Sequence, residues 1–251
     1  MFPYKDENPT VLTPVVTVGI IALNVLAWVF VQGLGAPGPL ARSVCQLGLT
    51  PGELLRTLPA GVRVPLGDQF SCVIQARPHY ATVLTSMFMH GGWFHLIGNM
   101  WFLWIFGNNI EDAMGHVRFA VFYLVCGVVA AATQVVVQPH SGVPMVGASG
   151  AISGVLGAYL LLYPRVRVHT LVFLGLFVTT ITLPAYLMLG YWILLQVLGG
   201  LPALASADTG GVAFFAHIGG FAAGMLFVGL FVKSDNLRRR PTAPVVYRSW
   251  S

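Results

Sequence analysis

A serine and a histidine in this chain have surroundings that could support covalent chemistry. Ser149 lies in the string P-M-V-G-A-S-G-A, where Pro144 and Gly147 predict an irregular entry and Ser149 opens a helix. The first N–H groups of a helix lack partners and lie at the positive end of its dipole, so they can stabilise an oxyanion. His217 lies in A-H-I-G-G-F-A-A-G. A serine with a histidine in reach is a nucleophile–base pair, so we predict acyl transfer by a Ser–His dyad.

The composition places these residues in a membrane protein. Of 251 residues, 56% are hydrophobic and 8% are charged, whereas a soluble domain carries roughly 25% charged residues. So few charges cannot cover a water-facing surface, which excludes a soluble enzyme, and the high hydrophobicity excludes a disordered chain. The net charge of +5 is carried mostly by loops and a tail, so nucleic acid is not an expected partner. We predict an all-α, polytopic membrane protein.

Six apolar segments are candidates for crossing the membrane, which takes about 20 apolar residues each. They cover 14–32, 93–110, 119–137, 148–163, 183–204 and 211–232. The predicted domains are an N-terminal segment 1–13, a six-span domain 14–232 that includes a long first loop 33–92, and a basic tail 233–251. The apolar segment 168–182 gives, with the fifth span, too many residues for one crossing and too few for two. We place it against the inner face of the membrane.

Basic residues in the short connections predict the orientation. Arg118 lies in the second connection, Arg165 and Arg167 lie in the fourth, and further basic residues lie in the tail. These places share one side of a six-span protein with the N-terminus, so we expect both termini in the cytoplasm and the protein in the cell membrane. The first loop carries four arginines and argues the other way, but its 60 residues reach the length at which the rule weakens. The N-terminus lacks the features of a signal peptide, so we expect no cleavage there.

The first loop, 33–92, is amphipathic and rich in Pro and Gly, which favours a substructure in the outer membrane interface over a free linker. Cys45 and Cys72 both lie in it, on the predicted oxidising side of the membrane. Spacing alone does not show that the two sulfurs meet, so a disulfide between them is an open hypothesis.

Counting residues from the cytoplasmic ends of three spans places three polar side chains at one depth. His95, Ser149 and His217 each lie 16 residues from a charge that marks such an end. The marking charges are Glu111, Arg165 and Lys233. At 1.5 Å per residue the three side chains lie roughly 24 Å into a core of about 30 Å. All three are therefore predicted to lie just below the outer surface.

Small residues predict which helices touch. The fourth span carries Gly150, Gly154 and Gly157, and the sixth carries Gly220 and Gly224. Spacing of small residues by four lets helix backbones approach closely. Both series start beside the serine and the histidine, so close packing would also bring hydroxyl to imidazole. Asn24, Gln134 and Gln196 are isolated amides in the other spans, and for these we expect structural hydrogen bonds.

Other chemistries fit the same residues less well. The serine string is not G-x-S-x-G, because Ala151 takes the last position and no strand precedes it, which excludes the α/β-hydrolase elbow. A zinc site built from His90, His95 and His217 would need three or four convergent ligands, and no H-E-x-x-H string is present. The spans contain no Asp or Glu, and the nearest outer-side carboxylate is Asp208 in the last loop. We therefore expect no metal, no cofactor and no carboxylate as a third member of the site.

Several motifs together resemble the rhomboid family of intramembrane serine proteases, over about residues 85–224. H-G-G-W-F-H-L-I-G-N-M matches the family's H-x-x-x-N, and N-N-I-E-D-A-M-G-H-V-R-F resembles its inner connection. G-A-S-G at 147–150 resembles the nucleophile motif, and A-H-I-G-G-F-A-A-G at 216–224 resembles the base motif with its glycine seam. The resemblance implies a six-transmembrane-helix bundle.

The resemblance also implies roles for single residues. Ser149 would attack a peptide carbonyl, and His217 would act first as general base and then as general acid. His95 and Asn99, with the Ser149 backbone N–H, would form the oxyanion hole. His90 would be structural. The substrates would be single-span membrane proteins, cut near the outer ends of their spans.

Supporting roles follow from the same resemblance, with one departure. Glu111 and Arg118 would anchor the inner connection, and the fifth span would be the lateral substrate gate. Many members carry a tyrosine one turn after the nucleophile that stacks on the base, and this chain has Ser153 there. A hydrogen bond or other packing would have to hold the base instead.

Two other functions compete with proteolysis. One is a catalytically inactive relative that binds and escorts membrane clients, although such relatives usually lack the nucleophile or the base. The other is a small-solute transporter, which would show paired broken spans and midplane charges. The sequence leaves the natural substrate and the oligomeric state open.

Overall fold

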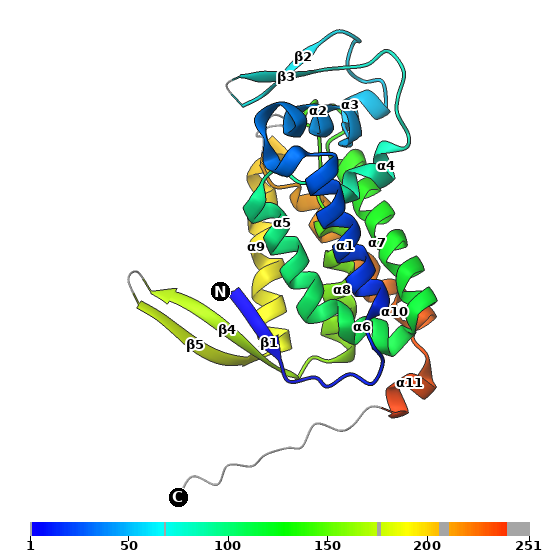
Figure 1. Cartoon of the computed structure of the whole chain (residues 1–251), viewed down its shortest axis with the longest axis vertical. Coiled ribbons are helices and arrows are strands. Elements are labelled where there is room, and N and C mark those ends of the chain that lie inside the picture. The colour runs from blue at the N-terminus through cyan, green and yellow to red at the C-terminus, as the bar shows by residue number, and fades with distance from the viewer. Residues whose placement is uncertain (1, 68, 175–176, 206–210, 240–251) are drawn as a thin grey trace, which may run out of the picture.

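The computed structural model describes residues 2–67, 69–174, 177–205 and 211–239, and it contains a helix in each of the six predicted apolar segments (Figure 1). The second segment is continuous but changes pitch, because one π-helical stretch joins two α-helices. The elements are α1 (Val15–Phe30), α5 (Trp93–Phe102), η3 (Leu103–Gly107), α6 (Asn108–Met114), α7 (His116–Val137), α8 (Ser149–Leu162), α9 (Ala185–Ala205) and α10 (Phe214–Phe231).

Three of these helices are long and apolar enough to cross a membrane by themselves: His116–Val137, Ala185–Pro202 and Phe214–Phe231. The chain is thus a mostly helical protein with the marks of an integral membrane protein. Helices α1 and α8 are apolar but shorter.

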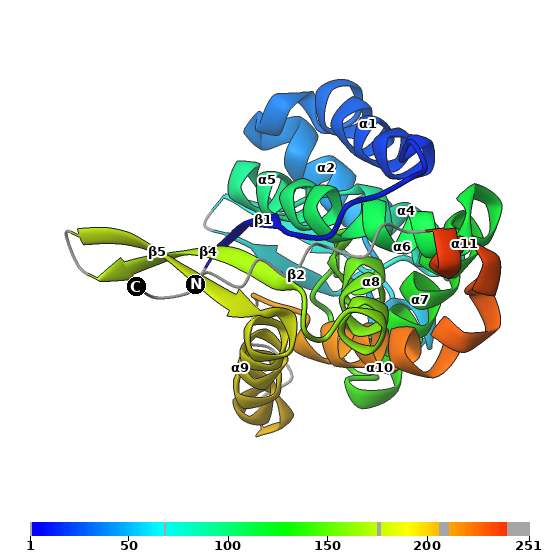
Figure 2. The ribbon, with the colours of Figure 1, turned by 90° about the horizontal axis from the view of Figure 1, so that it is seen from below.

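Helix α8 lies in the middle of the bundle (Figure 2). Every residue from 151 to 159 is buried. Its 14 residues span about 21 Å, which is less than a membrane core of about 30 Å. The irregular segment 138–148 therefore leads the chain down to Ser149, so the helix begins below one end of the bundle.

Glycines let α8 and α10 pack backbone against backbone. A Cβ on Gly220 would collide with the carbonyl oxygen of Gly150, and one on Gly224 would collide with that of Gly154. A Cβ on Gly157 would likewise collide with the backbone of Phe221. This contact fixes the register of the two helices and brings their first turns together.

A folded cap covers the end of the bundle at which α8 begins. We define the cap as residues 37–73, which include α2 (Pro37–Leu47), α3 (Pro51–Leu54) and the hairpin of β2 (Arg63–Leu66) with β3 (Phe70–Val73). Cys45 and Cys72 form a disulfide with their Cα atoms 5.2 Å apart, which joins α2 to β3. The open hypothesis of a disulfide is confirmed.

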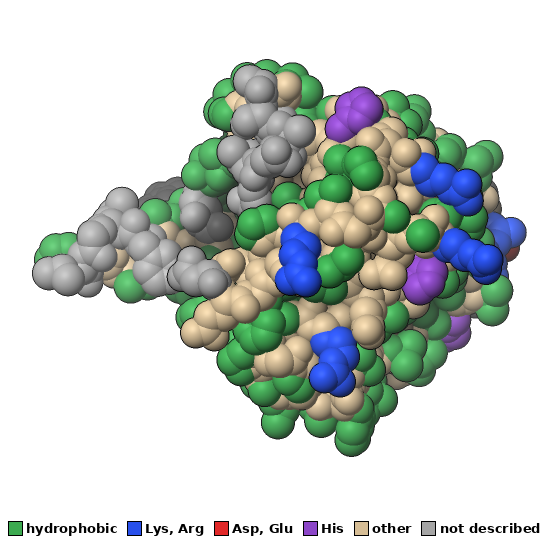
Figure 3. All heavy atoms as spheres, turned by 90° about the horizontal axis from the view of Figure 1, so that it is seen from above, with side chains coloured by type: hydrophobic (Ala, Val, Ile, Leu, Met, Phe, Trp, Pro, Cys, Tyr) green, Lys and Arg blue, Asp and Glu red, His purple; other side chains and the backbone are tan. Residues whose placement is uncertain are grey.

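Seen from above, this end of the molecule carries separate basic side chains among apolar ones (Figure 3).

Short elements complete the connection from the cap to the bundle and the C-terminal end. They are η1 (Gly33–Gly35), α4 (Thr82–Thr85), η2 (Ser86–Phe88) and α11 (Ser234–Arg239). The rest of the predicted basic tail, residues 240–251, lies outside the described residues.

The opposite end of the bundle is tied together by buried carboxylates on α6. Glu111 accepts hydrogen bonds from the backbone N–H groups of Val16 (2.9 Å) and Thr17 (2.8 Å) and from the Thr17 hydroxyl, so it caps α1. Asp112 accepts two more from the residues that precede α1. Arg118 on α7 donates long hydrogen bonds of 3.4 Å to the last carbonyls of α10.

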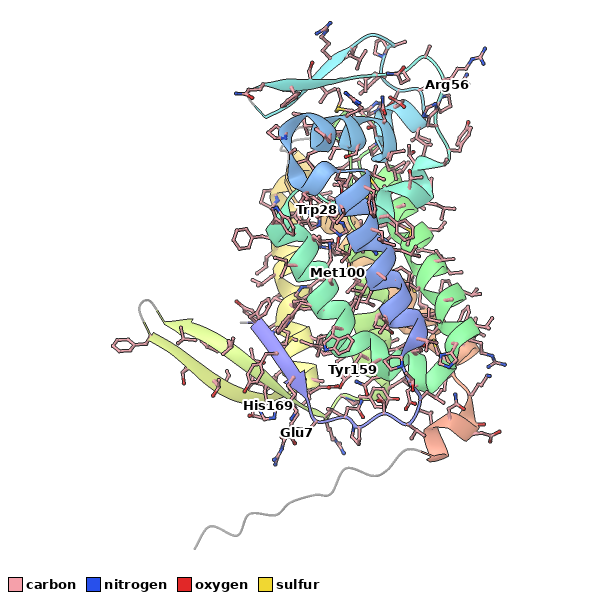
Figure 4. All side chains as sticks on the ribbon, in the orientation of Figure 1. Glu7, Trp28, Arg56, Met100, Tyr159 and His169 are labelled. Atoms are coloured by element: carbon pink, nitrogen blue, oxygen red, sulfur yellow. A yellow bond between two sulfur atoms is a disulfide. The ribbon has the colours of Figure 1, made fainter. Side chains whose placement is uncertain are left out.

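The all-α prediction is wrong in two regions: the cap contains the β2–β3 hairpin, and a three-stranded antiparallel sheet lies at this opposite end. Strand β4 (Arg167–Leu174) pairs on one side with β5 (Phe177–Pro184) and on the other with β1 (Phe2–Asp6). The segment 167–184 is rich in Thr, Val and Phe, which favour strands, and its apolar run concealed this preference. His169 on the central strand β4 and Glu7, directly after β1, lie close together in Figure 4, with 2.9 Å between His169 Nε2 and Glu7 Oε1.

Candidate active site

The serine and histidine singled out in the sequence face each other. Ser149 Oγ lies 2.8 Å from His217 Nε2, and both side chains are half-buried. Ser149 is the first residue of α8, and His217 lies in the first turn of α10. The glycine contact between the two helices accounts for this meeting, because it leaves no room to slide one helix along the other.

The backbone turn before Ser149 requires a glycine. Gly147 has φ +124°, a conformation that side-chain-bearing residues rarely adopt, and its N–H donates to the carbonyl of Ser86 at 2.9 Å. A Cβ here would lie 2.7 Å from His95 Nε2. The first bond of α8 runs from Ile152 N–H to the Ala148 carbonyl, so the N–H groups of residues 149–151 precede the helical ladder.

His95 presents an N–H to the same place. The backbone N–H of Gly91 donates to His95 Nδ1 at 3.2 Å, so in the neutral ring the proton lies on Nε2. That nitrogen is the side-chain atom that a Cβ on Gly147 would meet first. His95 therefore contributes a hydrogen-bond donor beside Ser149.

Asn99 lies one turn further along α5 and lines the same cavity as Ser149 and His95. Its side chain is buried, and its Nδ2 has no hydrogen-bond partner among the described residues. A buried donor without a protein partner is costly unless a water or a ligand group accepts from it. Asn99 is thus a second donor available to an incoming group.

His90 supports the start of α5. It is buried, and Gln32 brackets its backbone with two hydrogen bonds of 2.8 Å. Burial, with a smaller effect from the nearby His95, lowers the pKa of His90 to about 3. His90 is therefore uncharged at neutral pH and packs its ring edge-on against that of His95, with centroids 5.2 Å apart.

A cavity of about 1510 Å³ connects these groups with the cap. Ser149, His95, Asn99 and His217 line it on one side, and the hairpin residues 62–67 line it on the other. Its described lining includes no Asp or Glu. Asp208, the outer-side carboxylate of the sequence, lies outside the described residues.

The sequence did not predict which residues contact His217 on the side away from Ser149. Gln196 Oε1 lies 2.8 Å from His217 Nδ1, and the Trp192 ring lies 5.8 Å from the imidazole at 39°. Both residues belong to α9. Ser153 plays no such part, since its hydroxyl donates to the Ser149 carbonyl at 2.6 Å. The available signal was Gln196 itself, as the one amide of the fifth span.

The isolated amides of two other spans make local or neighbouring hydrogen bonds. Asn24 donates to the carbonyl of Ile20 in its own helix at 2.8 Å. Gln134 on α7 accepts from the backbone N–H of Ala216 at 3.2 Å, directly before His217. Gln134 therefore caps the first turn of α10.

Comparison with known proteins identifies related chains. The family model described as "Rhomboid domain" matches residues 77–234. The human "Presenilin-associated rhomboid-like protein, mitochondrial" is 32% identical over 155 residues, which are 58% of this chain and 36% of that protein. "Rhomboid protease GluP" of Bacillus subtilis is 38% identical over 85 residues, which are 34% of this chain and 16% of that protein.

A plant relative matches this chain to a similar extent. "RHOMBOID-like protein 4" of Arabidopsis thaliana is 33% identical over 144 residues, 57% of this chain and 32% of that protein. The chain thus matches about a third of the length of these curated relatives, or less. The residues that the family model matches run from just before α4 to the start of α11 and include Ser149 and His217.

Proposed function

This chain belongs to the rhomboid family, and from that premise we propose that it is an intramembrane serine endopeptidase. The observation that carries the proposal is the 2.8 Å contact between Ser149 Oγ and His217 Nε2, both on half-buried side chains, at the start of α8. One relative is named a rhomboid protease, which is consistent with the same chemistry.

In the proposed reaction Ser149 Oγ attacks the carbonyl carbon of a peptide bond while its proton passes to His217 Nε2. The C–N bond then breaks, and His217 returns that proton to the leaving amine. Water then attacks the acyl carbon and loses a proton to His217. The ester C–O bond breaks, and His217 returns that proton to Ser149 Oγ, so the dyad is restored.

The carbonyl oxygen becomes an oxyanion during the attack. We assign its stabilisation to His95 Nε2–H, Asn99 Nδ2–H and the Ser149 backbone N–H. His95 Nε2 lies beside the turn at Gly147, Asn99 lines the same cavity, and the Ser149 N–H precedes the α8 ladder. Donors held in advance at such a site typically contribute a factor of about 10²–10³ each to the rate.

The proposed topology has six crossings with the cap on the outer, oxidising side. The disulfide between Cys45 and Cys72 supports this side, because disulfides persist in oxidising compartments. Both termini are then cytoplasmic, and the cap lies in the outer interface. The cavity that connects Ser149 with the cap supports access of water from that side.

The proposed substrates are single-span membrane proteins, cut near the outer end of the span. A helix hides its amides, so the cleaved segment must unwind locally, which Gly and Pro favour. The cavity is lined largely by apolar residues, which suits an unwound apolar segment.

A reconstituted cleavage assay tests the proposal. Full-length protein in liposomes is mixed with a single-span substrate that carries Gly and Pro near its outer end, and products are read by mass spectrometry. We expect one cut near that end for the wild type and for Ser153→Ala, and none for Ser149→Ala. Binding of the substrate without cleavage by folded wild type would overturn the proposal and favour the client-escort function.

A further inference from the structure

The imidazole of His217 makes a hydrogen bond through each of its two ring nitrogens. Nε2 faces Ser149 Oγ at 2.8 Å, and Nδ1 faces Gln196 Oε1, also at 2.8 Å. Gln196 is buried on α9, while Ser149 opens α8. The ring is thus held between two helices that are not its own.

The amide of Gln196 has its orientation fixed by a second bond. Its Nε2 donates to the Trp192 carbonyl, one turn earlier in α9, at 3.2 Å. An amide nitrogen can only donate and a carbonyl can only accept, so the nitrogen must face Trp192. The oxygen then faces the imidazole, and it can only accept.

This arrangement determines the tautomer of the ring. Because Gln196 offers an acceptor, the proton of neutral His217 lies on Nδ1. Nε2 then carries the lone pair, directed at the Ser149 hydroxyl. That is the tautomer in which the histidine can receive a proton from the serine.

Trp192 supports the same ring by packing. Its indole lies 5.8 Å from the imidazole and stacks on Phe221 of α10 at 6.1 Å and 29°. The indole therefore fills the side of the histidine that faces α9. The Ser153 side chain on α8 does not supply this support, since its hydroxyl donates to the Ser149 carbonyl of its own helix.

We propose that Gln196, supported by Trp192, is the positioning residue of the base, so that α9 sets the proton acceptor of a dyad built on α8 and α10. The inference rests on the proposed function. During attack by Ser149, Gln196 keeps accepting the Nδ1–H while Nε2 takes up the serine proton.

The packing of α9 makes this contact sensitive to the seating of the helix. In α9 28% of the apolar span is buried, against 44% in α7 and in α10. Near Gln196 the close approach of α9 to α10 depends on Gly199, where a Cβ would collide with the Phe214 ring. On the same helix, a Cβ on Gly190 would meet nothing within 4 Å.

The first test reads the tautomer in the wild-type protein. The full chain is labelled with ¹⁵N-histidine, and the His217 signals are identified by their loss in His217→Ala. At a pH where the ring is neutral, we expect a protonated Nδ1 and an unprotonated Nε2. The proton on Nε2 in folded wild type would overturn the inference.

The second test compares two substitutions of Gln196 by the rate of labelling with a fluorophosphonate probe of serine nucleophiles. Gln196→Leu removes the acceptor, and we expect labelling about 10- to 100-fold slower, since the Nδ1–H is left unpaired. Gln196→Glu keeps an acceptor oxygen for the Nδ1–H but loses the donor to the Trp192 carbonyl, so we expect it to label faster than Gln196→Leu and more slowly than wild type. Equal rates for Leu and wild type would contradict the inference.

The third test uses the matched glycines of α9 and does not alter Gln196. Gly199→Ala should separate α9 from α10 and slow labelling about 3- to 10-fold, by weakening the bond to Nδ1. Gly190→Ala should label at the wild-type rate. Equal labelling of the two folded variants would show that the seating of α9 does not matter to the base.

The outcomes separate this inference from the proposed function. Wild type that neither labels nor cleaves would refute the proposed function and with it any role of Gln196. Wild type that is active while Gln196→Leu is equally active would refute only the positioning role.

Discussion

Buried polar groups gather at two ends of this bundle, and they differ in how completely they are paired. At the end of α6, Glu111 accepts from two backbone N–H groups, from the Thr17 hydroxyl and, at 2.6 Å, from His116. At the end of α8, the Nδ2 of buried Asn99 has no partner among the described residues.

The difference separates a structural use of polarity from a chemical one. A buried carboxylate surrounded by donors holds segments together and has no capacity left for a ligand. A buried donor without a partner destabilises the free protein and is available to a charge that forms later. We therefore expect substitutions near Ser149 to affect activity and substitutions near Glu111 to affect stability.

The largest expected effect is that of His217→Ala. The dyad loses its proton acceptor, so we expect peptide cleavage to fall by about 10⁴ or more. The free energy of unfolding should change by no more than about 1–2 kcal/mol, which is usual for a half-buried side chain. Cleavage and thermal unfolding of the same preparation measure the rate and the stability. Cleavage near the wild-type rate would show that His217 is not the general base.

Asn99→Ala is expected to be the next largest. It removes one proposed donor to the oxyanion, so turnover should slow by about 10²–10³. Because its Nδ2 lacks a partner, stability should stay within about 1 kcal/mol of wild type. Steady-state cleavage of a single-span substrate provides the rate, and unchanged turnover would remove Asn99 from the site.

Glu111→Gln should reverse this pattern. The amide keeps one acceptor oxygen but turns the other into a donor that faces N–H groups, so unfolding should become easier by about 3 kcal/mol. The active fraction should label with a fluorophosphonate at the wild-type rate. A slow labelling rate in fully folded variant would erase the distinction between the two ends.

Arg118→Gln should have the smallest effect. The side chain is exposed and its hydrogen bonds to α10 are long, at 3.4 Å, so we expect a loss of about 0.5 kcal/mol or less. Unfolding in increasing concentrations of a denaturing detergent measures this loss of free energy of unfolding. A loss as large as that of Glu111→Gln would mean that exposed contacts hold this end as firmly as buried ones.

The sequence predicts the parts of this arrangement that depend on local pattern. The apolar segment 14–32 contains α1 at Val15–Phe30, and the glycine spacing indicates the contact of α8 with α10. Equal counts of 16 residues indicate that Ser149 and His217 share a depth. Each of these follows from helix geometry, which depends on neighbouring residues alone.

Other features depend on contacts between distant segments and escape such reasoning. An amide in an apolar span looks the same whether it bonds within its helix, as Asn24 does, or to another helix, as Gln196 does. The outcome depends on how α9 is rotated about its axis. Strand β4 likewise pairs with β1, some 160 residues earlier, and no local pattern indicates that partner.

The most direct test of the central claim is labelling of the purified wild-type protein with a fluorophosphonate probe, with Ser149→Ala as control. The account predicts covalent labelling of wild type at Ser149, located by peptide mass spectrometry, and no labelling of the control. Folded wild type that stays unlabelled, or equal labelling of Ser149→Ala, would contradict the claim that the paired groups at the head of α8 activate this serine.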